Sequence, residues 1–582
     1  MTTSLQRGTA SIPEAATTLP PSSTRIMDEA VTVLQEHKQQ WARLEIAKRI
    51  AIIETLLSDY AAIAESWVAA ANRAKGIAPD SVTAGEEWLG GPLCINRNLR
   101  MLRQSLRDIQ RQGRPLLAGA ARVLPNGQVA APVMPQDFYE RLLYSGISAE
   151  IWMQPGVKLE RLTATQALAY HSPGAQGKVV LVLGAGNVAS IGPMDTLYKL
   201  FVENYVVLLK MNPVNAYLGP FIEKAFRVLS EQGFLRVVYG GSEEGAYLCH
   251  HPGVEEIHMT GSDKTFEAIV FGPGLEGAQR KAGRRPLLTK PFTSELGNVS
   301  PVIIVPGPWS TADIEFQAAN LATMLANNAG FNCVAMRVIV QHENWQQRPQ
   351  LLAALRQAFS RIPTRHAYYP GAAARYEAFY AAHPQARPIG AGGNGKLPWL
   401  LITDLDANAS DEICFTTESF CSAAAETCIS ATSIPEYLAH AVAFANQKLW
   451  GTLSATLIVH PASLKNPEIN AAVERAIADL RYGTVIVNHW SGMAYGLIST
   501  TWGAFPGHDI YDIQSGAGVV HNTLMFSQPE KSVVRGPFRA WPTPLWFATN
   551  RVLHRLAPKA ARFEAAPAVY KIPSLVATAV QG

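Results

Sequence analysis

Cys333 stands in a loop whose neighbours could make its thiol a nucleophile. The stretch Asn-Asn-Ala-Gly-Phe-Asn-Cys at 327–333 lies between an expected helix at 313–327 and an expected strand at 338–341. The thiolate is the reactive form of cysteine, so a helix terminus or a neighbouring base would activate this residue. Taken alone, a cysteine in such a place is more often an inert core residue.

Two further segments could contribute chemistry. Glu295, in Ser-Glu-Leu-Gly-Asn at 294–298, could act as a general base, although an isolated glutamate is usually solvated or paired. The glycine-rich stretch 184–192 follows an apolar strand and precedes a helix, where backbone N–H groups can approach a phosphate. Its third glycine comes six positions after the second instead of three, so the dinucleotide fingerprint fails in detail.

The surrounding pattern predicts two α/β domains that position these residues. Apolar residues recur at helical spacing over 26–75 and again over 95–112. Short apolar strands then alternate with helices, which is typical of parallel sheets. The expected strands lie at 178–183, 205–210, 235–239 and 255–259 in the first series, and at 301–305, 338–341, 398–402, 453–459 and 483–488 in the second.

Composition excludes several classes of protein. A chain of 582 residues is too long for one hydrophobic core, and a net charge of +4 is too weak for a nucleic-acid partner. No apolar run approaches the ~18 residues needed to span a bilayer. Six cysteines without a CxxC pair indicate reduced thiols and a cytoplasmic location.

Three of these cysteines recur every seven residues, at Cys414, Cys421 and Cys428. Seven is not a metal-ligand spacing, and no histidine accompanies them in the sequence. We therefore expect buried structural cysteines and no metal site.

Taken in order, the segments resemble the aldehyde dehydrogenase superfamily over about residues 27–510. The likeness rests on Gly186-Asn187-Val188, Leu209-Lys210, Met259-Thr260-Gly261-Ser262, the stretch 295–301, the cysteine loop at 329–333, Glu418-Ser419-Phe420 and the strand 483–488. The resemblance implies an α/β fold with a Rossmann-variant cofactor domain, an α/β catalytic domain and a small β-extension for oligomerisation.

The resemblance also implies a reaction, the oxidation of an aldehyde to a carboxylic acid with NAD or NADP. Cys333 would add to the carbonyl as the nucleophile and give a thiohemiacetal. The Asn187 amide and the Cys333 backbone N–H would stabilise its oxyanion. Once the cofactor has accepted the electrons, a thioester remains, and Glu295 would activate the water that hydrolyses it.

Cofactor contacts follow from the same likeness. Lys210 would bind the adenosine ribose, Gly261 and Ser262 the pyrophosphate, Glu418 and Phe420 the nicotinamide ribose, and Gly240 would lie near the adenine. The family's Lys-Pro-x-Glu reads Lys-Met-Asn-Pro at 210–213, so the usual ribose-binding carboxylate is missing. The choice between NAD and NADP therefore stays open.

The predicted domain boundaries cover the whole chain. We expect a disordered leader at 1–25, a cofactor domain at 26–154 and 175–294, a catalytic domain at 295–507, oligomerisation strands at 155–174 and 508–535, and a basic extension at 536–582. The strands imply a homodimer or homotetramer.

The C-terminal extension is basic. Between Lys531 and Gly582 there are eight basic residues and one acidic residue. A packed extension is favoured over a weak contact with an anionic membrane surface.

Two rival functions remain. A CoA-acylating aldehyde dehydrogenase (an acyl-CoA reductase) shares this fold but generally lacks the water-activating glutamate, so Glu295 argues against it. A non-catalytic binding protein is disfavoured because Asn187, Glu295, Cys333 and Glu418 occur together.

Three apolar residues near the end of the resemblance are also candidates for the site. Trp490, Met493 and Trp502 are expected as walls of the substrate channel or as plain core residues.

Overall fold

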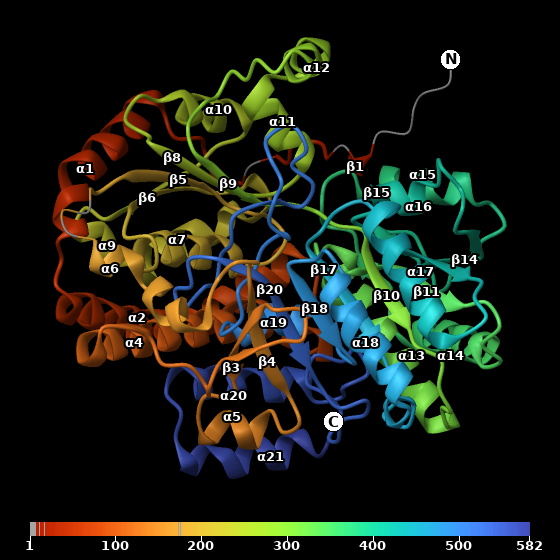
Figure 1. The fold of residues 1–582 in the computed structure, drawn as a ribbon. Coiled ribbons are helices and arrows are strands. Elements are labelled where there is room, and N and C mark those ends of the chain that lie inside the picture. The colour runs from red at the N-terminus through yellow and green to blue at the C-terminus, as the bar shows by residue number, and fades with distance from the viewer. Residues whose placement is uncertain (1–6, 11, 17, 173, 175) are drawn as a thin grey trace.

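Two largely parallel sheets lie side by side and are covered by helices (Figure 1). The computed structural model describes residues 7–10, 12–16, 18–172, 174 and 176–582. The predicted α/β fold is confirmed. The expected strands occur within about two residues of their predicted bounds, except the one expected at 398–402, which spans Leu400–Asp406. The first sheet carries the predicted cofactor residues, and the second carries the cysteine loop.

The first sheet has six strands in the order β19-β9-β8-β5-β6-β7. They are β19 (Gly516–Ala517), β9 (Phe292–Glu295), β8 (Glu256–Thr260), β5 (Val179–Leu183), β6 (Val206–Lys210) and β7 (Leu235–Val238). All except β19 run parallel. Helices α1 (Thr24–Ala42), α2 (Ile46–Ala74) and α4 (Cys94–Gln112) pack their apolar faces into the same core.

The second sheet has ten strands in the order β14-β16-β11-β10-β17-β18-β20-β4-β3-β2. Its parallel part comprises β14 (Leu400–Asp406), β16 (Ala423–Ile429), β11 (Met336–His342), β10 (Ser300–Ile304), β17 (Ser454–Ile458), β18 (Thr484–Val487) and β20 (Pro529–Arg535). The flanking helices are α13 (Thr311–Ala326), α14 (Arg348–Arg361), α17 (Ile434–Gln447) and α18 (Pro467–Asp479).

Three antiparallel strands extend this sheet and correct one prediction. They are β4 (Ser148–Met153), which pairs with β20, followed by β3 (Val129–Met134) and β2 (Arg122–Val123). The strand expected within 155–174 is wrong: Leu159–Thr165 is a 3-10 helix and Leu168–His171 a short α-helix. That segment begins with Pro155-Gly156 and places Lys158, Glu160 and Arg161 within four residues, whereas β3 and β4 carry the buried apolar residues that a strand needs.

The prediction of a disordered leader is wrong for its described part; residues 1–6, 11 and 17 lie outside the described residues. Strand β1 (Gly8–Thr9) pairs in parallel with β15 (Thr417–Glu418), between the two sheets (Figure 1). The Thr9 backbone N–H donates to Asp263 Oδ1 at 2.9 Å, and its hydroxyl donates to the same oxygen. Polar composition suggested disorder, but these contacts depend on distant partners that composition does not reveal.

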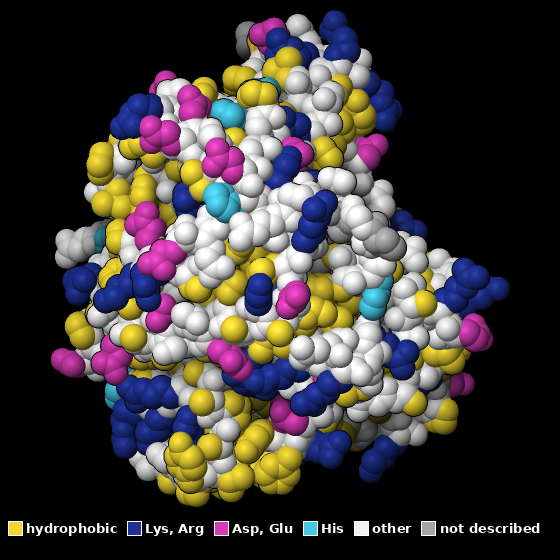
Figure 2. All heavy atoms as spheres, turned by 90° about the vertical axis from the view of Figure 1, so that its left-hand side faces the viewer, with side chains coloured by type: hydrophobic (Ala, Val, Ile, Leu, Met, Phe, Trp, Pro, Cys, Tyr) yellow, Lys and Arg dark blue, Asp and Glu magenta, His cyan; other side chains and the backbone are white. Residues whose placement is uncertain are grey.

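The C-terminal extension is packed, as favoured from the sequence. Helix α20 (Leu553–Ala565) contacts α4 and the segment 82–93, and α21 (Ile572–Ala579) contacts α20. At the lower end of the face in Figure 2, where these helices and α5 (Phe138–Leu143) lie, apolar and basic side chains gather. Among the described helices, none is long and apolar enough to cross a bilayer.

A buried ion-pair network joins this extension to the cofactor domain. Arg97, on α4, is fully buried and pairs with Glu140 and, at 2.9 Å, with Glu564 of α20. Arg100 binds the other Glu564 oxygen at 2.6 Å. Burial alone would raise the pKa of Glu564, but the two guanidiniums hold it below its usual value. The carboxylate is therefore charged at neutral pH and ties α20 to α4.

Glu564→Gln is expected to loosen α20, because it leaves two arginines short of a buried partner. We expect the local opening free energy of α20 to fall by about 3 kcal/mol, measured by hydrogen exchange of the 553–565 amides. The matched control is Glu160→Gln at an exposed site, which should change it by less than about 0.5 kcal/mol. Equal protection of α20 in Glu564→Gln and wild type would contradict the assigned role.

Candidate active site

Two openings of different character meet at Cys333. One is an apolar channel whose walls include Leu89, Val188 and Trp490. The other is a larger cleft along the first sheet. Among the described residues, Cys333 is the only one that lines both. A thiol at this junction is accessible from either side, as a nucleophile between a substrate and a cofactor must be.

The cleft lies at the carboxyl edge of the first sheet, where open α/β sheets bind ligands. Lys210, Thr260 and Glu295 end the parallel strands β6, β8 and β9, and the register pairs Thr260 with Glu295. The predicted residues that line the cleft are Asn187, Lys210, Gly261, Ser262, Glu295, Cys333, Glu418 and Phe420. Gly240 is not among them, whereas its neighbour Gly241 is.

Cys333 and Glu295 are linked by a side-chain hydrogen bond. Burial raises the pKa of Glu295 to about 8, the bond to Cys333 opposes this rise, and the Asp195 and Glu418 carboxylates add to it. The pKa of the Cys333 thiol is raised well above its usual value by burial and by the two glutamates. The resting pair is therefore a neutral thiol beside a carboxyl that can take up a proton near physiological pH.

The cysteine loop is held in an unusual backbone conformation. Asn328 and Ala329 have φ values of 51° and 57°, a region that costs energy for residues other than glycine. Arg337 opposes this cost, since its guanidinium donates to Gly330 O at 2.7 Å and to Cys421 O at 2.9 Å. The Asn328 N–H donates to Glu86 at 3.1 Å. The loop is thus fixed from both sides before the nucleophile.

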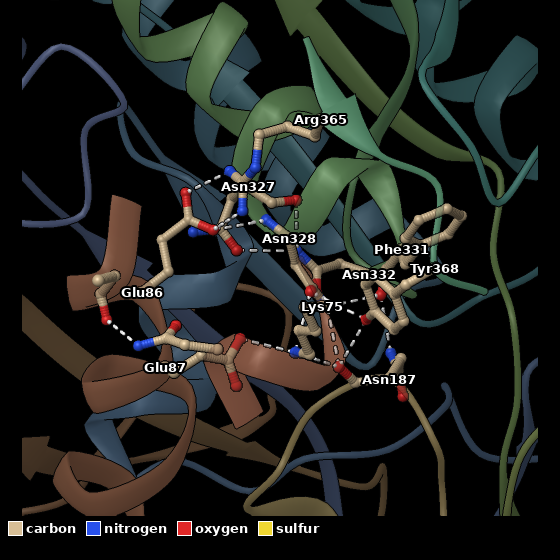
Figure 3. Close-up of polar contacts among 12 residues, drawn as sticks. Lys75, Glu86, Glu87, Asn187, Asn327, Asn328, Phe331, Asn332, Arg365 and Tyr368 are labelled. Atoms are coloured by element: carbon tan, nitrogen blue, oxygen red, sulfur yellow. Dashed lines mark hydrogen bonds and ion pairs between the residues drawn. The ribbon is translucent and has the colours of Figure 1, made fainter. Parts of the chain in front are cut away.

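Asn187 is the centre of a polar network that reaches the cysteine loop (Figure 3). Its side-chain amide donates to Phe331 O at 3.0 Å, which leaves the second N–H of that amide for another acceptor. Its backbone carbonyl accepts from Lys75 Nζ at 3.0 Å, Asn328 Nδ2 at 3.0 Å and the Tyr368 hydroxyl at 3.0 Å. Three donors on one carbonyl fix the turn that carries Asn187.

The substrate side of the site is apolar and includes the C-terminal extension. Trp490, Met493 and Trp502, expected as channel walls, all line it. Leu545 and Trp546 of the extension line it as well. Trp490 Nε1 donates to Val334 O at 2.8 Å. Val334 follows Cys333 in the chain, so this bond holds the Trp490 ring close to the cysteine loop. The extension therefore forms part of the wall of the channel.

Comparison with known proteins agrees with this arrangement. Residues 179–373 match the model of the aldehyde dehydrogenase family, a stretch that carries Asn187, Glu295 and Cys333. The chain also superposes on NADP-dependent glyceraldehyde-3-phosphate dehydrogenase from Bacillus halodurans C-125 with a TM-score of 0.58 and 16% identity, covering 89% of this chain and 92% of that one. Residues 179–373 are therefore related to the aldehyde dehydrogenase family, and the chain as a whole has the fold of these enzymes.

Other members are similarly distant. An aldehyde dehydrogenase from Mycobacterium tuberculosis, solved with NAD⁺, superposes with a TM-score of 0.57 and 17% identity over 88% of this chain and 91% of that one. In sequence, 4-trimethylaminobutyraldehyde dehydrogenase A from Danio rerio is 34% identical over 136 residues, which is 23% of each chain. The alignment thus spans about a quarter of that relative's length.

The residues that surround Asn187 were not singled out from the sequence. Lys75 is buried, pairs with Glu87 at 2.7 Å and bonds Asn328 Oδ1 at 3.1 Å. Glu86 forms a bidentate pair with Arg365, both distances being 3.1 Å. Lys75 and Glu86 lie more than 100 positions from both Asn187 and Asn328 in the chain, and no local spacing marks them. Only the asparagine-rich character of 327–332 gave a signal, and it was not assigned a role.

The structure also brings a histidine to one of the three regularly spaced cysteines. His383, Glu412 and Cys414 have potential ligand atoms within 4.8 Å of one another, and His383 Nε2 lies 3.2 Å from Glu412 Oε2. No histidine stands near these cysteines in the sequence, but the fold brings His383 close to Cys414. Cys414 and Cys421 are buried, and Cys428 is half-buried.

Proposed function

We propose that this protein oxidises an aldehyde to a carboxylic acid with NAD or NADP as the electron acceptor. The observation that carries the proposal is the position of Cys333, at the junction of an apolar channel and the cleft, with Glu295 hydrogen-bonded to it. The family match over 179–373 supports it.

The chain's own groups suffice for the covalent steps. Cys333 Sγ adds to the carbonyl carbon as the thiolate, its proton passing to solvent, and the second Asn187 N–H and the Cys333 backbone N–H stabilise the oxyanion. One such donor is typically worth about 10²–10³ in rate. After oxidation of the adduct to a thioester, Glu295 removes a proton from water, the hydroxide attacks the acyl carbon, and Cys333 leaves as the acid forms.

The cleft fits a nicotinamide dinucleotide, which when bound supplies the two-electron acceptor. Glu418 is 2% exposed, and its Oε1 has no hydrogen-bond partner among the described residues. Such a buried acceptor suits a ribose hydroxyl. Ser262 caps α11 (Asp263–Phe271), whose N-terminal end suits a phosphate. The solved relatives named above include one complexed with NADP and one with NAD⁺.

The channel favours uncharged aldehydes with an aliphatic or aromatic body. Its wall is largely apolar and includes four Leu, three Trp, two Val and one Met side chain, and its charged members Lys75, Glu86 and Glu87 are already paired. A free charge on the substrate would lose hydration without gaining a partner.

A single assay separates the proposal from its rivals. Purified protein is mixed with a panel of apolar and charged aldehydes and with NAD⁺ or NADP⁺, with and without CoA, and reduced cofactor is measured. We expect CoA-independent turnover, with kcat/KM at least about tenfold higher for apolar aldehydes. Turnover that requires CoA would identify an acyl-CoA reductase, and none with any aldehyde would favour a binding protein.

Assembly and location are also proposals. We infer a homodimer or homotetramer, supported by the antiparallel extension β20-β4-β3-β2 at the end of the second sheet. A cytoplasmic location is supported by six unpaired cysteines. Weak contact of the extension with an anionic membrane surface is the less favoured alternative, since its helices already pack on α4.

A further inference from the structure

The described parts of the N-terminal segment, residues 7–10, 12–16 and 18–22, lie along the cofactor cleft. Its start pairs with Glu418 through β1, and its end is fixed at β7, where Ser22 Oγ accepts from the Tyr239 N–H at 3.0 Å. Between these points, Ile12, Pro13, Glu14 and Ala15 line the cleft. The segment is therefore a wall of the site, although the sequence suggested a disordered leader.

Glu14 reaches the end of the cleft expected to hold the adenosine ribose. Its Oε1 accepts from the Ser242 N–H at 2.5 Å, and its Oε2 accepts from the Ser242 hydroxyl at 2.9 Å. Ser242 begins α10 (Ser242–His250), so the carboxylate occupies the position of an anion at a helix N-terminus. Ser242 and Gly241 line the cleft as well.

Lys210 lies at the same end and has a free ammonium. Its side chain is 7% exposed and lines the cleft, and it takes part in no hydrogen bond or ion pair within the described residues. Burial lowers the pKa of Lys210 to about 8, and the nearby Glu244 and Glu14 carboxylates oppose this shift. An unpartnered buried cation facing the cleft indicates a polar ligand at this point.

The charge balance at this end is negative. Glu244 caps α10 by accepting from the Gly241 N–H at 2.7 Å, so two carboxylates face one lysine. The stretch 210–213 lacks the acidic residue that the resemblance stated above implies after this lysine. Glu14 brings a carboxylate back to the same place from the other end of the domain.

We propose that Glu14 is a specificity-determining residue that makes the cleft select NAD over NADP. The inference rests on the proposed use of a nicotinamide dinucleotide. A carboxylate accepts a hydrogen bond from a ribose 2′-hydroxyl. A 2′-phosphate would instead meet the charges of Glu14 and Glu244 and would compete with Glu14 for the Ser242 donors.

The test compares two ligands that differ only by the 2′-phosphate, 5′-AMP and adenosine 2′,5′-bisphosphate, by calorimetric titration of the full-length protein. We expect wild type to bind 5′-AMP at least about tenfold more tightly. In Glu14→Gln this preference should shrink by at least about tenfold, while Glu14→Asp, which keeps the charge, should retain most of it. NAD⁺ and NADP⁺ should show the same order.

The titration measures binding without any turnover. Its result can therefore be interpreted even if the protein oxidises no aldehyde. Glu14 is exposed, so its replacement does not disturb the core. The charge-matched control, Glu160→Gln, should leave the preference unchanged. The inference is overturned if Glu14→Gln keeps the wild-type preference, or if wild type binds the bisphosphate more tightly than 5′-AMP. It is also overturned if Glu14→Gln binds both ligands more tightly by the same factor, because the segment would then only block access to the cleft.

Discussion

Cys333→Ala is expected to lower aldehyde oxidation by about 10⁴-fold or more while leaving NAD⁺ binding intact. The thiol is the only group placed at the junction of both openings, so no other nucleophile in the described residues can take over its role. Cofactor contacts would persist, because Lys210 and Glu418 lie on other elements of the cleft. Steady-state rates and calorimetric NAD⁺ binding measure the two parts separately.

The control for that experiment is Cys428→Ala. Cys428 lies on β16 and lines neither opening, so its loss should change the rate by less than about twofold. A Cys333→Ala protein with near-normal turnover would show that the reaction does not pass through this thiol. Loss of NAD⁺ binding in the same variant would mean that the residue supports the cleft instead of reacting.

Glu295→Gln is expected to separate the two halves of the reaction. Without a base for water, the thioester should accumulate, giving a burst of reduced cofactor near one per active site and a steady-state rate lower by about 10²–10⁴-fold. Glutamine keeps the size of the side chain and can still bond Cys333, so the site should remain assembled. Stopped-flow absorbance measures both phases. Loss of the burst would place Glu295 in the first half of the reaction.

The same residue predicts the pH dependence of deacylation. Because burial raises the pKa of Glu295 to about 8, the carboxylate needed as a base is a minority species at neutral pH. The steady-state rate should therefore rise with pH up to about 8 and level off above it. In Glu295→Gln this rise should disappear. A flat wild-type profile between pH 6 and 9 would contradict the assignment of Glu295 as the base.

The parallel sheets were predictable because buried strands leave continuous local patterns. Asn187, Glu295, Cys333 and Glu418 were brought together by the resemblance to a known family, since each residue alone gave only a weak signal. The strand at 155–174 was placed wrongly: the resemblance implied a strand there, whereas the stretch that pairs with β20 is Ser148–Met153. The side chains of Ser148–Met153 are largely buried in the folded chain, where this stretch pairs with β20. Burial of this kind cannot be read from the sequence.

Contacts between distant segments could not be predicted in the same way. Lys75, Glu14 and Glu564 each act through a partner more than ten positions away, and surface-like composition surrounds Glu14 in particular. Their roles depend on which elements become neighbours. The sequence showed that no acidic residue follows Lys210 in the stretch 210–213. It did not show that Glu14 places a carboxylate at the same end of the cleft.

The central claim is that Cys333 carries the acyl group between oxidation and hydrolysis. It is tested most directly by incubating Glu295→Gln with NAD⁺ and a medium-chain aliphatic aldehyde, quenching in acid, and mapping the product by peptide mass spectrometry. We predict that the peptide containing Cys333 gains the mass of the acyl group in close to one copy per active site. Acid product formed with no acyl group on Cys333, or an acyl group on another residue, would contradict the account.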